Sequence, residues 1–184
     1  MTALLFLSMV FGLIIAIWLK RRYRLKIPVT LDFGLVACAV LFMRFSHDFA
    51  GAAKGLIMAQ CLIPASYIDA KTHEIPNWVH VILLLDGLIK INVAEAAVGL
   101  LIISVPCLLI SRLTKGGIGG GDIKLLAACG FVLGAAGIVY GTAVGMTLFC
   151  AIHIRSLFKR SKQKPRYPLA PCLSAGCFFV YVFI

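Results

Sequence analysis

Apolar runs separated by short polar connections cover almost the whole chain. A helix that crosses a bilayer needs roughly 20 predominantly apolar residues, and several of these runs are shorter, so their ends are approximate. The pattern predicts an all-α polytopic transmembrane bundle of about eight spans. These segments lie at about 2–19, 31–46, 55–69, 79–91, 94–111, 123–135, 138–154 and 168–184.

The region 123–154 is divided in two because Gly134, Gly137 and the alanines between them favour a tight turn. The basic residues support this division. With the N-terminus outside, the inner connections hold all but three of the 18 Lys and Arg residues, as the positive-inside rule expects. A single span over 123–154 would move the basic loop 155–166 to the outer side, so eight spans is the favoured topology.

The composition is that of an integral membrane protein. Hydrophobic residues make up 61% of the 184 positions and charged residues 14%, with a mean hydropathy of +1.01. A soluble domain has roughly 45–50% apolar and about 25% charged residues. The length leaves room for one domain, so residues 1–184 are expected to form a single unit in the lipid bilayer. The net charge of +11 lies in loops without any nucleic-acid motif, which argues against a nucleic-acid partner.

Neither a cleaved signal peptide nor a metal centre is expected. The first apolar run is followed, not preceded, by the basic residues Lys20-Arg21-Arg22, so it is a retained helix. The seven cysteines include no C-x-x-C pair, which argues against a structural zinc site and favours a packing role for them. We expect no metal and no organic cofactor.

Two acidic residues, Asp69 and Asp122, lie where an acid is costly. Each is next to an apolar run, and an ionisable side chain beside hydrocarbon indicates function. The topology places Asp69 at the inner end of the third span and Asp122 at the inner start of the sixth. The two carboxylates are therefore expected on one membrane face, at one depth.

Such a pair has the chemistry of an aspartic protease. Two carboxylates a few ångströms apart do not both ionise easily, so they share a proton. One then acts as general base on a water, while the other donates its proton to the scissile carbonyl oxygen. Gly119, Gly120 and Gly121 allow close backbone approach and are expected to bind an extended substrate through main-chain hydrogen bonds.

Each acid also has an ordinary structural alternative. Asp122 can be an N-cap of the following helix, and Asp69 can pair with Lys71. Asp86 lies within the fourth segment with Lys90 four residues later, a spacing that predicts a structural ion pair. Glu74 either supports the site or is a solvated loop residue. The histidines outside that loop are scattered and are expected to be packing or interfacial residues, namely His47, His80 and His153.

Other hydrolytic and phosphate-binding motifs are absent from the sequence. His73-Glu74 has no second His to complete H-E-x-x-H, which excludes that zinc metalloprotease motif. No G-x-S-x-G serine elbow is present. The glycine run lacks the G-K-[ST] ending of a phosphate-binding loop.

These residues resemble the type IV prepilin peptidases, membrane aspartic proteases with an Asp, an Ile/Leu-Pro-Asn/Asp element and then a G-x-G-D motif. Asp69 with Ile75-Pro76-Asn77 matches the first part, and Gly119-Gly120-Gly121-Asp122 matches the second. The stretch 123–128 and the last-helix entry at 167–171 are also similar to the family.

The resemblance implies that Asp69 and Asp122 are catalytic. It implies prepilin-like substrates, cut between a short basic leader and a hydrophobic helix at the cytoplasmic face of a prokaryotic cell membrane. Larger members carry a cytoplasmic insert with two C-x-x-C pairs and N-methylate the new N-terminus. The first inner loop here, about residues 20–30, has no Cys, so the expected activity is cleavage without methyl transfer.

Two rival functions stay open on the residues alone. Paired membrane carboxylates also serve transporters that couple to protons or cations, although the expected inverted repeats are not visible here. Another membrane aspartic peptidase, acting on lipoprotein signals or transmembrane helices, would use the same pair of acids.

Overall fold

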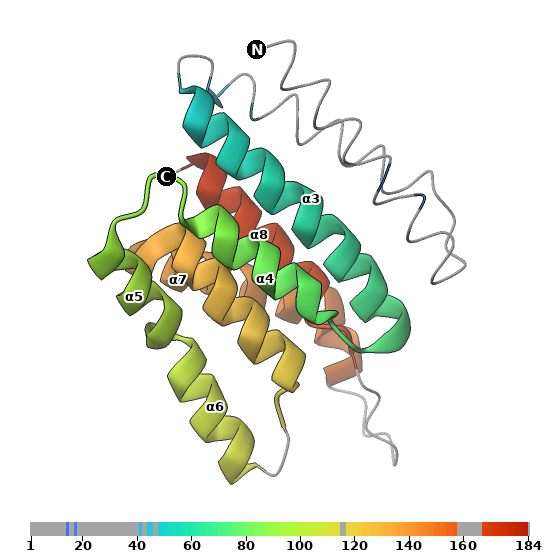
Figure 1. Ribbon diagram of the computed structural model, residues 1–184. Coiled ribbons are helices and arrows are strands. Elements are labelled where there is room, and N and C mark those ends of the chain that lie inside the picture. Colours follow the sequence, from blue (N-terminus) through green and yellow to red (C-terminus); the bar gives the residue numbers. More distant parts are fainter. Residues whose placement is uncertain are drawn as a thin grey trace.

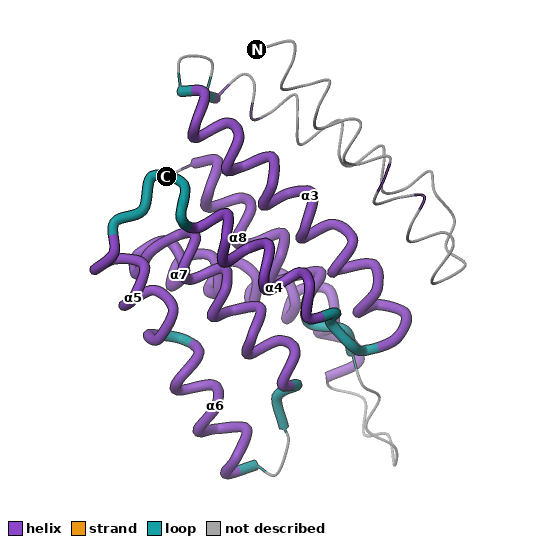
Figure 2. Tube along the Cα trace, viewed as in Figure 1, coloured by secondary structure: helices purple, strands orange, loops and turns teal. Residues whose placement is uncertain are grey.

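The computed structural model describes residues 49–114, 117–157 and 167–183, together with Ile14, Ile17, Leu41, Arg44, Phe45 and Asp48. The described chain is helical and contains no strand, which confirms the all-α prediction (Figures 1 and 2). Apart from isolated residues, the predicted segments 2–19 and 31–46 lie outside the described part. The helices are α3 (Phe49–Thr72), α4 (Asn77–Gly87), α5 (Val93–Ile102), α6 (Ser104–Leu113), α7 (Gly120–Leu157) and α8 (Ala170–Phe183).

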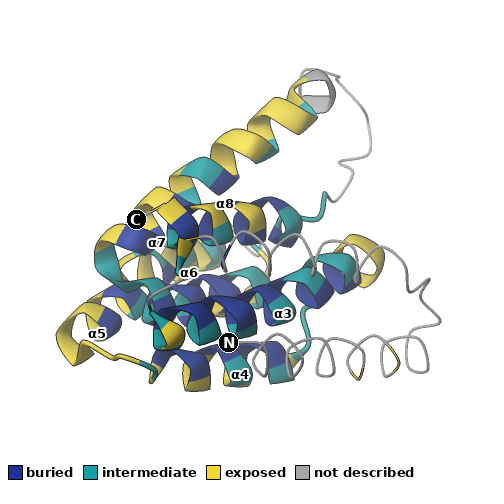
Figure 3. Cartoon of the chain, turned by 90° about the horizontal axis from the view of Figure 1, so that it is seen from above, coloured by how far each residue is buried: buried dark blue, intermediate teal, exposed yellow. Residues whose placement is uncertain are grey.

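The core lies where α3, α4, α7 and α8 meet, and buried residues concentrate there (Figure 3). Three cysteines belong to this core, in agreement with the packing role expected for them. The core members that are at most 1% exposed are Met58, Cys61, Ala65, Val79, Leu83, Leu125, Ala128, Cys129, Ile138, Ala170, Leu173 and Cys177.

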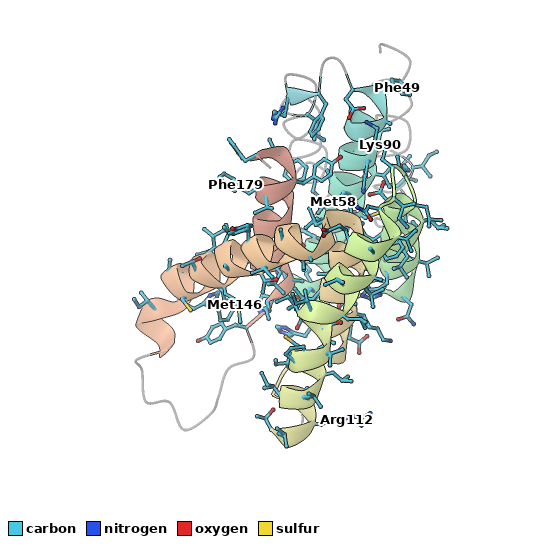
Figure 4. The ribbon with its side chains drawn as sticks, turned by 90° about the vertical axis from the view of Figure 1, so that its left-hand side faces the viewer. Phe49, Met58, Lys90, Arg112, Met146 and Phe179 are labelled. Carbon is cyan, nitrogen blue, oxygen red and sulfur yellow. The ribbon has the colours of Figure 1, made fainter. Side chains whose placement is uncertain are left out.

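Helix α7 bends sharply at Gly134, within the region where a turn was predicted. Gly134 has φ 75° and ψ −179°, a conformation that a residue with a side chain adopts only under strain. Glu95 Oε2 accepts a hydrogen bond from the backbone N–H of Ala135 at 3.4 Å, so the second arm of α7 begins with a capped amide. In Figure 4 this arm, marked by Met146, runs across the view and away from Met58.

The second arm of α7 packs closely against α8 because glycines line the contact. A Cβ atom on Gly176 would lie 2.4 Å from the carbonyl oxygen of Gly141 and 2.5 Å from the nitrogen of Gly145. Gly141 and Gly145 are four residues apart, the small-residue spacing that lets membrane helices approach each other. This contact sets the position of α8, whose first turn reaches the site described below.

The predicted segment 94–111 is broken into α5 and α6 at Ile103. Pro106 has no backbone N–H, so it leaves the carbonyl of Ile102 without its helical donor. The two short helices together still form a 21-residue apolar stretch, Val93–Leu113, with little of its surface buried in the protein.

Three described stretches are long and apolar enough to cross a membrane: Phe49–Thr72, Val93–Leu113 and Gly120–Ile154. They fit a multi-pass membrane protein. Helix α4 has only 11 residues, about 16 Å at the usual rise, and is too short to cross alone. The predicted count of eight spans is not confirmed.

The predicted ion pair between Asp86 and Lys90 is wrong. Helix α4 ends at Gly87, so Lys90 is no longer on the helical face of Asp86. Lys90 Nζ instead binds Asp48, 2.6 Å from its Oδ2, and this hydrogen bond lowers the pKa of Asp48 below its ordinary value. Asp86 is 2% exposed, and neither of its carboxylate oxygens has a hydrogen-bond partner among the described residues.

Candidate active site

The last turn of α3 and the sharp connection after it supply one half of the site. Asp69 lies in this turn and is 5% exposed. His73 ends the helix in the left-handed conformation, with φ 54°, and its N–H donates to the carbonyl of Asp69. The chain then reverses within a few residues, and Pro76 precedes the first residue of α4. The C-terminal end of α3, which carries Asp69, and the start of α4 therefore follow each other closely in the chain, and Figure 1 shows these two helix ends at one end of the bundle.

The first turn of α7 supplies the other half. The N–H of Ile123 donates to the carbonyl of Gly119, so the helix starts from the glycine run. Asp122 is the third residue of α7 and not its N-cap, in contrast to the structural alternative for this residue. An acid in the first turn interacts favourably with the positive end of the helix dipole.

These two halves enclose a pocket of about 260 Å³ that contains both candidate carboxylates. Asp69 and Asp122 are close enough for the charge of one to act on the other. All three glycines proposed to bind substrate lie in the pocket wall, and Glu74 does too. The lining residues are Asp69, His73, Glu74, Ile75, Asn77, Gly119, Gly120, Gly121, Asp122 and Lys124.

Helix α8 holds Asp69 in place. The backbone N–H of Ala170, the first residue of α8, donates to Asp69 Oδ2 at 3.1 Å in a buried position. The first amides of a helix have no partner within it, so the carboxylate satisfies one of them and lies at the positive end of the helix. The alternative partner of Asp69, Lys71, instead has its Nζ over the ring of Tyr67.

Asp122 is placed differently from Asp69. Its Oδ1 is buried and has no hydrogen-bond partner among the described residues. A Cβ atom on Gly119 would lie 3.0 Å from its Oδ2, so the glycine leaves room for this carboxylate. One acid is thus fixed by a backbone donor, while the other has an oxygen without a protein partner in the described structure.

Helix α4 is connected to the glycine run and to the start of α7 by one contact each. His80 Nε2 lies 3.3 Å from the carbonyl oxygen of Gly121, and Lys124 Nζ lies 3.5 Å from Asn77 Oδ1. Sequence reasoning treated His80 as a packing or interfacial residue. The available signal was its spacing, since His80 is three residues after Asn77 and so lies on the helical face that meets the site.

Nothing in the sequence indicated that the backbone N–H of Ala170 would bind Asp69. The two residues are 101 positions apart, and a backbone donor has no residue type that marks it. Within the described residues, no group of three or more His, Cys, Asp or Glu side chains is arranged to hold a metal ion.

Known proteins are similar to this chain in the region that contains both halves of the site. Residues 56–155 match the model of the type IV leader peptidase family. Over 92 residues the chain is 37% identical to the prepilin leader peptidase/N-methyltransferase of Bacillus subtilis (strain 168). The match covers 48% of this chain and 34% of that protein, so the chain spans about a third of the length of this relative. No solved structure matches the chain.

Proposed function

This chain belongs to the type IV leader peptidase family, and on that premise we propose that it is a membrane aspartic endopeptidase that removes leaders from prepilin-like proteins. The observation that carries the proposal is the pocket holding Asp69 and Asp122 together, at the ends of two different helices. The proposed cleavage at the cytoplasmic face is supported by the distribution of basic residues along the chain.

The two acids take different roles in this proposal. Asp69, whose Oδ2 receives the N–H of Ala170, is the general base and removes a proton from the attacking water. Asp122 carries the shared proton and donates it to the scissile carbonyl oxygen, which gives a gem-diol. Asp122 takes a proton back as the C–N bond breaks, and Asp69 delivers its proton to the leaving nitrogen.

The glycine run is proposed to bind the substrate backbone next to these acids. Gly120 is exposed in the pocket, and a Cβ atom there would meet nothing within 4 Å. An extended peptide can therefore approach the main chain closely and pair with its amides and carbonyls. We propose cleavage without N-methylation, because the sequence contains no C-x-x-C pair.

Purified protein in detergent or liposomes tests the function directly. We expect it to shorten a prepilin-like precursor, with the new N-terminus at the end of the basic leader and unmethylated in the presence of S-adenosylmethionine, as mass spectrometry can determine. Cleavage of a lipoprotein precursor alone would indicate a different signal peptidase. Proton-driven uptake into liposomes without any cleavage would indicate a transporter. A methylated product would contradict the proposal that this chain does not transfer methyl groups.

Alanine substitutions in the glycine run should separate catalysis from binding. In Gly119→Ala the new methyl group presses on Asp122 Oδ2, so we expect kcat to fall about tenfold. In Gly120→Ala the methyl group enters the open pocket, so the main effect should be a higher KM. Steady-state kinetics on one precursor measure both values. Equal losses of kcat in the two variants would contradict the steric role of Gly119.

A further inference from the structure

His80 is buried beside the pocket but is not part of its wall. It lies in the first turn of α4, is 7% exposed, and has its Nε2 3.3 Å from the carbonyl oxygen of Gly121. A carbonyl oxygen only accepts hydrogen bonds, so the ring donates from Nε2. The contact joins α4 to the residue immediately before Asp122.

Through this contact the His80 ring reaches the main chain of another helix. Its Nδ1 is buried and has no hydrogen-bond partner among the described residues. Burial of the ring disfavours a positive charge on it, and the nearby positive charge of Lys124 does so as well. A neutral ring with its proton on Nε2 fits this environment, because it donates to Gly121 and carries no positive charge.

The glycine run needs an anchor of this kind. Glycine has no side chain to pack and the greatest backbone freedom of any residue, so such a segment is held through its main chain. A Cβ atom on Gly120 would touch nothing within 4 Å, and one on Gly121 would only reach Ile75 at 3.4 Å. Two side chains from other helices bind the main chain of this loop: Ser111 donates to the carbonyl of Ile118, just before the run, and the buried His80 donates to the carbonyl of Gly121 within it.

We propose that His80 is a positioning residue that holds the Gly119–Asp122 turn against α4 and so keeps the Asp122 carboxylate aligned with Asp69. The proposal rests on the proposed function for the role of Asp122. The contact itself is a property of the fold and can be measured without any substrate.

Two substitutions at His80 and one control separate positioning from packing. His80→Leu fills similar space without a donor, whereas His80→Gln keeps an N–H that can reach the Gly121 carbonyl. Leu83→Ala, at a fully buried core position of the same helix, removes packing but keeps the His80 ring and its hydrogen bond to Gly121. The readouts are kcat and KM on a prepilin-like precursor, thermal stability, and amide hydrogen exchange over residues 117–126.

We expect His80→Leu to lower kcat about tenfold with KM changed less than about twofold, and to speed exchange over 117–126. His80→Gln should restore both values. Leu83→Ala should lower the melting temperature and leave kcat near that of the wild type.

Wild-type kcat and exchange in His80→Leu would overturn the proposal. So would faster exchange over 117–126 in Leu83→Ala to the same degree, or a loss in His80→Leu that His80→Gln does not restore. If the wild-type protein cleaves no precursor, the proposed function fails, and the exchange data alone then decide whether His80 holds the turn.

Discussion

Replacement of Asp122 by Asn is expected to abolish cleavage of a co-expressed prepilin-like precursor, and Asp69→Asn should do the same. Asn has nearly the same volume as Asp but cannot share, accept or deliver the proton that the reaction requires. Loss of a single catalytic acid or base lowers kcat by about 10⁴-fold or more in well-studied proteases. Over the time of an expression experiment, such a loss leaves the precursor full-length on a gel.

The fold should survive both changes. In Asp69→Asn the amide oxygen can still accept the N–H of Ala170, so α8 keeps its first-turn contact. Asp122 Oδ1 has no partner to lose within the described structure. Normal amounts of membrane-inserted protein and an unchanged melting temperature would establish that the loss is chemical.

Asp86→Asn is the matched control. Asp86 is also a buried carboxylate, but it lies outside the pocket and its oxygens have no hydrogen-bond partner in the described residues. This variant should cleave the precursor as the wild type does. Full activity in both Asp69→Asn and Asp122→Asn would eliminate the assignment of these residues as the catalytic pair.

The second large effect is expected from substitution of Gly176, which is not among the residues that line the pocket. A Cβ atom there would lie 2.4 Å from the carbonyl of Gly141 and 2.5 Å from the nitrogen of Gly145, both of them rigid helix backbone. Gly176→Leu therefore forces α7 and α8 apart, and overpacking of this kind typically costs about 1–3 kcal/mol, occasionally more. We expect a strong reduction in the yield of monodisperse protein on size exclusion and a lower melting temperature.

This packing defect should also reach the site, because α8 carries the amide that binds Asp69. Any folded Gly176→Leu protein should therefore show reduced cleavage. Gly176→Ala should have the same effect to a smaller degree. Phe179→Leu, on the same helix at a position that is 51% exposed, should behave as the wild type. Wild-type yield and melting temperature in Gly176→Leu would show that the close contact between α7 and α8 is wrong.

Several features could be predicted because their causes are local. A long apolar run without Gly/Pro clusters favours a helix, so α3, α7 and α8 were found, although their ends differ from the predicted ones. Gly134 breaks α7 because its own backbone conformation favours glycine. The two acids could be identified because a carboxylate beside hydrocarbon is costly in any fold.

Other features were not predicted because they depend on the residue at which a helix ends. The spacing of Asp86 and Lys90 fits an ion pair only if α4 continues to Lys90, and it stops at Gly87. The lysine was then available to Asp48, 42 residues earlier in the chain. In the same way, the break at Ile103 turned one predicted segment into two helices.

Local sequence patterns thus predicted a helical membrane protein and singled out two acids as candidates for peptide hydrolysis. Only the packing of the helices established that α8 donates an amide to Asp69 and that His80 contacts the carbonyl of Gly121. Hydropathy and motif spacing depend on residues a few positions apart. The hydrogen bonds that organise this site join residues 101 and 41 positions apart, and such pairs are defined only when the bundle is assembled.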